Sequence, residues 1–106
     1  MQNFRNPEEL LARLNEKNPN DILLDVRTPQ EFSDGHILGA SNFNISTPDI
    51  INKIQNLDKS KTYILYCRSG GRSQMAAMIM EQNKLNVINC QFGIMHLGGS
   101  DIEISY

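Results

Sequence analysis

The sequence predicts an α/β domain built around a mainly parallel β-sheet. Three short, nearly continuous apolar runs have the character of strands buried on both faces: residues 22–26, 63–66 and 87–90. Segments with helical spacing of apolar residues alternate with these runs. This alternation predicts a parallel sheet covered by helices, with functional sites at the carboxyl ends of the strands.

The first helix is predicted over residues 7–17. Asn6 supplies the capping side chain, Pro7 occupies the first helical position, and Glu9 follows three residues after the cap. Two further helices are expected over residues 48–54 and 74–84. We expect the methionines of the last helix and its surroundings to fill the core: Met75, Met78, Met80 and Met95.

Size and charge indicate one small globular domain spanning residues 1–106. The chain is 40% apolar, and 10 basic residues against 12 acidic ones give a net charge of −2. This balance gives no general attraction for nucleic acid or anionic membranes, so we expect neither partner. No stretch approaches the ~18 apolar residues of a membrane span, and the first fifteen residues lack a signal-peptide pattern, so we expect a cytoplasmic protein.

Two cysteines are too few for a disulfide framework, and their spacing matches no metal site, so we expect neither metal nor cofactor. Cys90 falls within an apolar strand, where a free cysteine usually behaves as a small hydrophobic residue. Cys67 is different, because it ends a strand and precedes a polar, glycine-containing loop. The loop residues are Arg68, Ser69, Gly70, Gly71, Arg72 and Ser73.

This loop has the features of an anion-binding turn with sulfur at its centre. Backbone N–H groups can converge there because Gly70 and Gly71 tolerate positive φ, and the following helix adds a partial positive charge. Arg68 and Arg72 add two cations, and we expect Ser73 at the helix N-cap. Together these groups should lower the pKa of Cys67 to about 3.5–7.5 and make it a nucleophile. The alternative is an ordinary strand-to-helix turn with a buried thiol and solvated arginines.

Two reactions fit such a loop: attack on phosphorus, or storage of sulfur as a persulfide on the cysteine. The spacing from Cys67 to Arg72 is C-x4-R, one residue shorter than the C-x5-R loop of cysteine-dependent phosphatases. The shorter loop favours a single sulfur atom over a phosphoryl group.

Two separated motifs resemble those of single-domain rhodaneses. The first is LDVRTPQEF at residues 24–32 with GHILGASN at residues 35–42, and the second is YCRSGGRS at residues 66–73. The resemblance implies a rhodanese-like α/β fold with a central, mostly parallel five-stranded sheet flanked by helices. It also implies a sulfurtransferase whose Cys67 alternates between thiolate and persulfide, with the amides of residues 68–73 stabilising the persulfide.

The resemblance also bears on donor and acceptor. Thiosulfate-using rhodaneses tend to have a basic loop, so Arg68 and Arg72 favour thiosulfate or another small anionic sulfur donor, with a thiol or a cyanide-like acceptor. Two alternatives stay open: a sulfur-relay module acting with a sulfur-acceptor protein, and a phosphatase or arsenate reductase on the same fold. The chain departs from the family near its end, because it has no tryptophan.

Other polar residues near the predicted site have structural interpretations. We expect Asp25 and Arg27 to form a buried pair that holds the loops, and Glu31 to brace them. His36 is expected to be a hydrogen-bonding, structural histidine, since a thiolate needs no general base to begin the reaction. His96 has no partner in the sequence and is expected at or near the surface.

Overall fold

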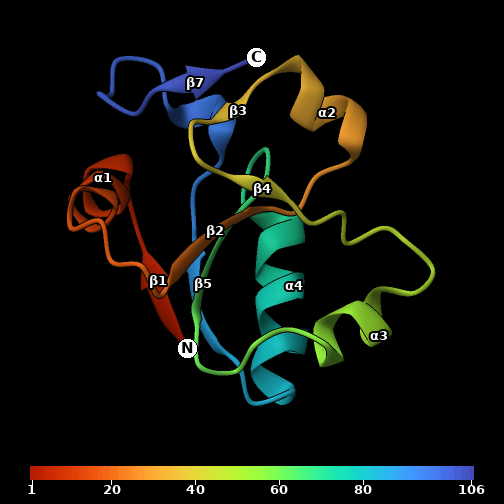
Figure 1. Ribbon diagram of the computed structural model, residues 1–106. Coiled ribbons are helices and arrows are strands. Elements are labelled where there is room, and N and C mark those ends of the chain that lie inside the picture. The colour runs from red at the N-terminus through yellow and green to blue at the C-terminus, as the bar shows by residue number, and fades with distance from the viewer.

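The computed structural model describes all residues from 1 to 106 and contains a five-stranded, wholly parallel sheet (Figure 1). Its strands lie in the order β1-β6-β5-β2-β4, with β5 in the middle. Their bounds are β1 Gln2–Phe4, β6 Asn86–Cys90, β5 Thr62–Tyr66, β2 Asp21–Asp25 and β4 Ser41–Asn42. The predicted α/β fold with a parallel five-stranded sheet is therefore confirmed.

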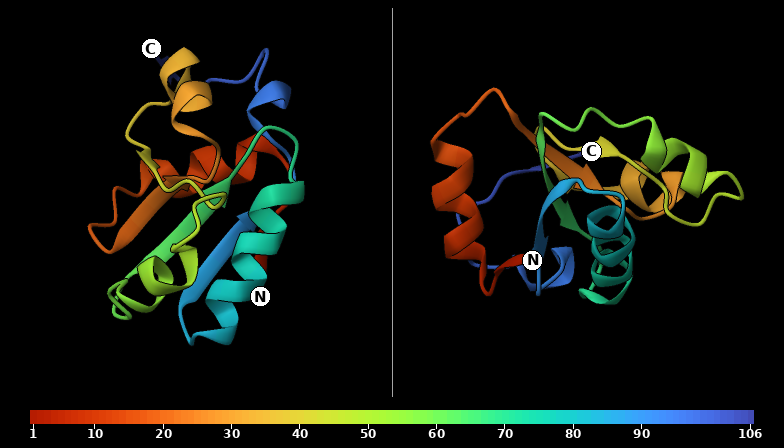
Figure 2. Two further views of the ribbon diagram at one scale, coloured as in Figure 1. Left: turned by 90° about the vertical axis from the view of Figure 1, so that its right-hand side faces the viewer. Right: turned by 90° about the horizontal axis from the view of Figure 1, so that it is seen from below.

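Helices cover both faces of this sheet (Figure 2). One face packs against α1, and the other packs against α4 and α3. A fourth helix, α2, lies beyond the carboxyl ends of the strands, beside a small antiparallel pair of strands. The bounds are α1 Pro7–Asn15, α2 Pro29–Asp34, β3 His36–Ile37, α3 Ile50–Gln55, α4 Gly71–Gln82, the short 3-10 helix η1 Ile94–His96 and β7 Ile104–Ser105.

The helix starts follow from capping side chains. The Asn6 side chain accepts the Glu9 N–H at 3.0 Å, as the sequence predicts. At α2, Thr28 and Glu31 form a reciprocal capping box. This second helix was not among the predicted elements, because its six residues are too few to show a helical period. No helix is long and apolar enough to cross a membrane.

Two predictions about α4 are wrong. The helix begins at Gly71 rather than residue 74, because Gly70 adopts the left-handed conformation that ends the loop early. Ser73 is consequently the third residue of the helix and not its N-cap. The inward face of α4 is made by small side chains and one methionine, namely Ser73, Ala76, Ala77 and Met80.

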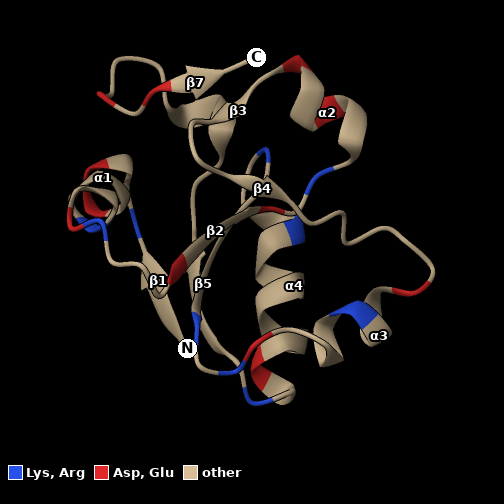
Figure 3. Cartoon of the chain, in the orientation of Figure 1, with Lys and Arg blue, Asp and Glu red and all other residues tan.

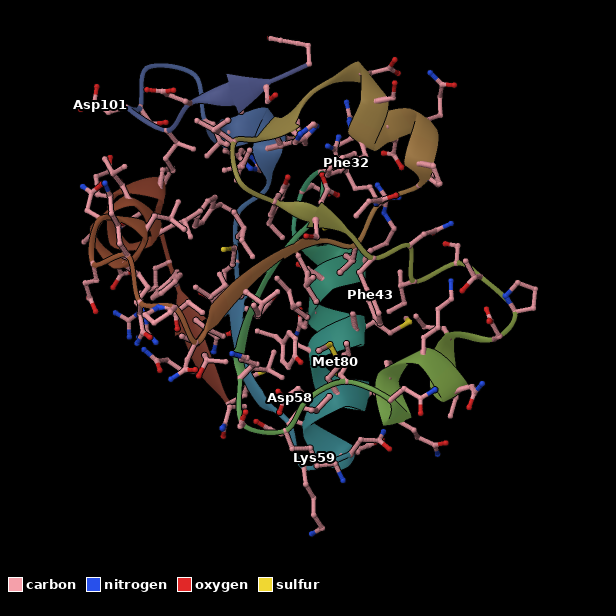
Figure 4. The ribbon with its side chains drawn as sticks, in the orientation of Figure 1. Phe32, Phe43, Asp58, Lys59, Met80 and Asp101 are labelled. Atoms are coloured by element: carbon pink, nitrogen blue, oxygen red, sulfur yellow. The ribbon has the colours of Figure 1, made fainter.

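Only one of the four methionines predicted in the core is there. Met80 is fully buried between α4 and the sheet (Figure 4). Met75, Met78 and Met95 are 63%, 51% and 54% exposed. The buried residues Ser73, Ala76, Ala77 and Met80 follow the i, i+3, i+4, i+7 spacing of one helix face, and Met75 and Met78 lie outside that face.

The sheet separates the core into two clusters. Tyr66 and Cys90 belong to the cluster on the α1 side, whereas Cys67 belongs to the cluster on the α4 side. Successive side chains of a strand point to opposite faces, which explains how neighbours in the chain reach different clusters. The two cysteines of the protein therefore lie on opposite faces of the sheet.

Candidate active site

Cys67 directly follows β5, the middle strand, at the carboxyl edge of the sheet (Figure 1). The loops after its two neighbours, β2 and β6, reach the same edge because the strands are parallel. The side chain is only 1% exposed, and its Sγ accepts the Gly70 N–H at 3.0 Å. The thiol thus lies at the base of a tight turn that leads into α4.

Gly70 is required at this turn. Its φ is +110°, in the left-handed region, and a Cβ added there would lie 2.9 Å from the Gln91 carbonyl oxygen. Side chains other than hydrogen fit neither the conformation nor the space. Gly71, by contrast, is the first residue of α4, and a Cβ there would meet no atom within 4 Å.

The pKa of the Cys67 thiol is lowered from its ordinary value. Burial alone raises it, but hydrogen bonds to the sulfur outweigh this effect, from the Ser73 backbone and hydroxyl and from the Gly70 and Ser69 amides. The lowering therefore comes mainly from donors built into the loop and the first turn of α4. A thiolate at this place is a nucleophile without a neighbouring base.

Ser73 is buried beside the sulfur. Its hydroxyl also lies 3.1 Å from the Gly70 carbonyl oxygen and 3.5 Å from that of Cys90. The hydroxyl hydrogen can point to only one acceptor at a time. Formation of a thiolate strengthens the sulfur as an acceptor, so the hydroxyl is placed to turn toward it.

The two loop arginines have different environments. Arg72 makes a two-pronged ion pair with Glu31 of α2, with N···O distances of 2.7 and 2.9 Å. Arg68 is exposed and forms no ion pair. Basic segments of the loop and of α4 lie below the acidic α2 (Figure 3). Arg68 is therefore the loop cation whose charge is not already balanced by a carboxylate.

Glu31 is held in place from two sides. Besides Arg72, the N–H and hydroxyl of Thr28 contact its Oε1 at 3.2 and 3.1 Å. The hydrogen bonds from Arg72 are the main reason that the pKa of Glu31 falls to about 2. As expected, Glu31 braces the loops: it joins α2 to the first turn of α4 across 41 residues of sequence.

The buried pair Asp25 and Arg27 also has the expected structural arrangement. Arg27 donates to both Asp25 oxygens, at 2.9 and 2.6 Å, and to the Gly35 carbonyl at 2.6 Å. The hydroxyl of Tyr66 accepts the Ile37 N–H at 3.0 Å. These bonds join the end of β2, the end of α2 and β3 beneath the site.

The remaining expectations for His36 and Cys90 also agree with the structure. His36 Nδ1 lies 2.8 Å from the Phe32 carbonyl oxygen, and its ring stacks on that of Phe32 with a distance of 3.7 Å between the ring centres. Cys90 is fully buried, and burial raises the pKa of its thiol to about 12. It is a packing residue on the far face of the sheet from Cys67.

Sequence reasoning missed that the segment after β6 supports the backbone of the Cys67 loop. Residues 93–96 lie against the loop, where Ile94 N–H donates to the Cys67 carbonyl at 2.9 Å and Met95 N–H to that of Arg68 at 3.3 Å. The one sequence feature that could have indicated this contact is Gly93, which follows Phe92 and leaves room for a neighbouring backbone.

Two surface hollows lie elsewhere. Their volumes are about 470 and 350 Å³, and they adjoin one another beside α1, where Leu14, Lys17 and Leu38 line both. Residues 67–73 line neither of them. The candidate site is therefore a tight loop that lies outside both hollows.

Comparison with known proteins identifies relatives over most of the chain. The family model for the rhodanese-like domain matches residues 6–97. A protein of Allochromatium vinosum named a sulfurtransferase is 35% identical over 97 residues, which are 90% of this chain and 87% of that protein. A putative sulfurtransferase of Bacillus subtilis is 34% identical over 69% of each chain. A tRNA sulfurtransferase of Actinobacillus succinogenes is 32% identical over 63% of this chain, but only 14% of that protein is matched.

Solved structures show the same fold. A crystal structure from Staphylococcus saprophyticus has a TM-score of 0.81 and 30% identity, covering 97% of this chain and 99% of that one. A rhodanese-like domain protein from Staphylococcus aureus has a TM-score of 0.81 and 26% identity, covering 100% of both chains.

Proposed function

The chain belongs to the rhodanese-like domain family, and from this premise we propose that it is a sulfurtransferase whose Cys67 carries sulfur as a persulfide. The observation that carries the proposal is the Gly70 N–H that donates to the Cys67 sulfur at 3.0 Å at the carboxyl edge of the sheet, where the neighbouring Ser73 and Ser69 also lower the pKa of the thiol. These donors stabilise a negative charge on sulfur. Relatives named as sulfurtransferases support the same class of activity.

The reaction proceeds in two nucleophilic steps. The Cys67 thiolate attacks the outer sulfur of the donor, the donor's S–S bond breaks, and for thiosulfate sulfite leaves with the electron pair. The acceptor then attacks the outer sulfur of the persulfide, and the Cys67 thiolate leaves. Cyanide as acceptor gives thiocyanate, and no external oxidant or reductant is needed.

The loop donors serve both states of the cysteine. The outer sulfur of a persulfide lies about 2 Å beyond Sγ. In this proposal the amides of residues 68–73 stabilise the negative charge on that outer sulfur. The same residues, Arg68 and Arg72 among them, bind the anionic end of the donor.

Within this set we assign the direct contact with the donor to Arg68, because its guanidinium is exposed and unpaired. Arg72 keeps N–H groups that do not point to Glu31, since only two of its five are used there. This basic pair favours a small anionic donor such as thiosulfate. The C-x4-R loop length disfavours the phosphatase or arsenate reductase alternative.

A second candidate is a sulfur relay, in which a protein partner accepts the sulfur and turnover on small acceptors is slow. The support for it is that the matched segment makes up only 14% of the tRNA sulfurtransferase of Actinobacillus succinogenes. A domain of this kind thus occurs as a small part of a longer protein. The expectation of a cytoplasmic location stays a prediction.

The test is thiocyanate release from thiosulfate and cyanide. We expect turnover by the unmodified chain and by the matched control Cys90→Ala, which alters the other cysteine, and none by Cys67→Ser. Turnover by Cys67→Ser would refute the assignment of the nucleophile. A persulfide that forms on Cys67 without rapid thiocyanate release would favour the relay.

A further inference from the structure

The turn formed by residues 93–96, called here the bracing turn, makes repeated backbone contacts with the Cys67 loop. Its Ile94 and Met95 amides donate to the carbonyls of Cys67 and Arg68, at 2.9 and 3.3 Å. These carbonyls share their peptide groups with the N–H groups of Arg68 and Ser69, and the Ser69 amide is one of the groups that lower the pKa of the Cys67 thiol. The bracing turn therefore fixes the first two peptide groups of the loop, directly before Gly70, whose N–H donates to Cys67 Sγ.

Gly93 brings the two segments into contact. A Cβ at this position would lie 1.8 Å from the Arg68 carbonyl oxygen and 2.3 Å from the Ser69 nitrogen. The φ of Gly93 is −130°, which any residue adopts without strain. Glycine is thus needed here for the close approach of the loop backbone.

His96 closes the bracing turn through its own side chain. Its Nδ1 accepts the Gly93 N–H at 3.0 Å, which fixes the ring hydrogen on Nε2. The same turn is held by a bond from the His96 N–H to the Gly93 carbonyl at 2.9 Å. The geometry is that of a side chain at the third helical position accepting from the cap residue, a place where glutamine also serves.

We propose that His96 is a positioning residue for the Cys67 loop: through Nδ1 it keeps Gly93 and the bracing turn pressed against Cys67 and Arg68. The loop amides then stay directed at the sulfur. His96 is exposed and bonds to its own turn, so it acts through the loop and not on the substrate. The relevance of this positioning to sulfur transfer rests on the proposed function, but its effect on the thiol does not.

The test variants differ in one acceptor atom. His96→Leu removes the acceptor, whereas His96→Gln retains one at the position where a capping glutamine accepts from the cap N–H. A second pair tests the close approach itself: Gly93→Ala forces the segments apart. Its control is Gly98→Ala, where an added Cβ would meet no atom within 4 Å.

The measurement is the rate of alkylation of Cys67 by iodoacetamide as a function of pH, followed by intact mass on the whole chain. Cys67 and Cys90 are both buried, but burial raises the pKa of the Cys90 thiol to about 12, so the variants are made in a Cys90→Ala background and each gain in mass reports Cys67 alone. The midpoint of the profile reports the thiol pKa. Greater access to a loosened loop would change the plateau rate, but not this midpoint.

We expect the His96→Leu midpoint to rise by about 0.3–0.7 pH unit, which is about two- to fivefold less thiolate below the midpoint. This range corresponds to losing up to one hydrogen bond of ordinary net strength. His96→Gln and Gly98→Ala should match the Cys90→Ala parent, and Gly93→Ala should shift the midpoint at least as far as His96→Leu. If His96→Leu does not fold, His96→Ala takes its place, since it lacks the acceptor without adding apolar surface.

An unchanged midpoint in a folded His96→Leu or His96→Ala protein would overturn the proposal, and so would a glutamine variant that shifts as far as leucine. Failure of the proposed function is a separate result. If the unmodified chain takes up no sulfur from any donor, the persulfide assignment fails, while the alkylation midpoints still decide the role of His96.

Discussion

The ion pair between Glu31 and Arg72 should make a measurable and pH-dependent contribution to stability. Its two bonds, at 2.7 and 2.9 Å, join α2 to the first turn of α4 beside the Cys67 loop. Glu31→Gln keeps the size of the side chain and removes its charge. We expect this variant to be less stable than the unmodified chain at neutral pH.

The magnitude follows from the lowered pKa of Glu31. The shift from 4.5 to about 2 would correspond to about 3 kcal/mol if it were transmitted in full. The two side chains remain 37% and 29% exposed, however, so solvent screening reduces the expected loss to about 1–2 kcal/mol. For a chain of this length that loss lowers Tm by about 5–10 °C.

The sign of the pH dependence is fixed by the same shift. A carboxyl group whose pKa is lowered by folding stabilises the folded state above its unfolded pKa of 4.5. That contribution is lost as the pH falls from about 4.5 through about 2. The difference between Glu31→Gln and the unmodified chain should therefore be largest near pH 7 and fall to a small fraction of that value near pH 2.

The assay is urea unfolding at pH 7, 4 and 2, with Glu103→Gln as the control for an exposed carboxylate that forms no ion pair. We expect the control to match the unmodified chain at every pH. Equal stability of Glu31→Gln and the unmodified chain at pH 7 would refute the interpretation of this pair as a brace.

For three further substitutions, a single contact in the structure predicts whether the thiol pKa or the stability rises or falls. Ser73→Ala removes a hydroxyl beside the Cys67 sulfur and should raise the thiol pKa by up to about one unit, measured by thiolate absorbance; an unchanged titration would contradict this role. Tyr66→Phe leaves the Ile37 N–H without its acceptor and should cost about 1–3 kcal/mol in urea unfolding, so a neutral result would count against that bond. Asn89 is 2% exposed, with an Oδ1 that has no partner, so Asn89→Val should raise Tm; a lower Tm would show that this oxygen is satisfied.

The strands β2, β5 and β6 were predictable because each is a short apolar run, whereas the edge strands β1 and β4 are short and largely polar and were not predicted. The run at residues 22–26 corresponds to β2 at Asp21–Asp25, with a difference of one residue at each end. The start of α1 was predictable for a similar local reason, since its cap and proline are adjacent in the sequence. Such features depend on neighbouring residues only.

The errors and omissions depend on contacts between distant residues. The start of α4 depends on Gly70, whose left-handed backbone is fitted against Gln91. Arg72 forms its ion pair with Glu31, which lies 41 residues away in the sequence. Nothing in the local pattern around Gly93 shows that it touches Arg68. The sequence could therefore predict that Cys67 and its loop follow a buried strand, but not the supports that hold the loop in shape.

The central claim is that Cys67 accepts a sulfur atom, and intact mass measurement tests it most directly. The reduced chain is exposed briefly to thiosulfate beside Cys67→Ser and Cys90→Ala. We predict a gain of one sulfur atom, about 32 Da, in the unmodified chain and in Cys90→Ala, and no gain in Cys67→Ser. A gain that persists in Cys67→Ser, or no gain by the unmodified chain from thiosulfate or any other persulfide donor, would contradict the claim.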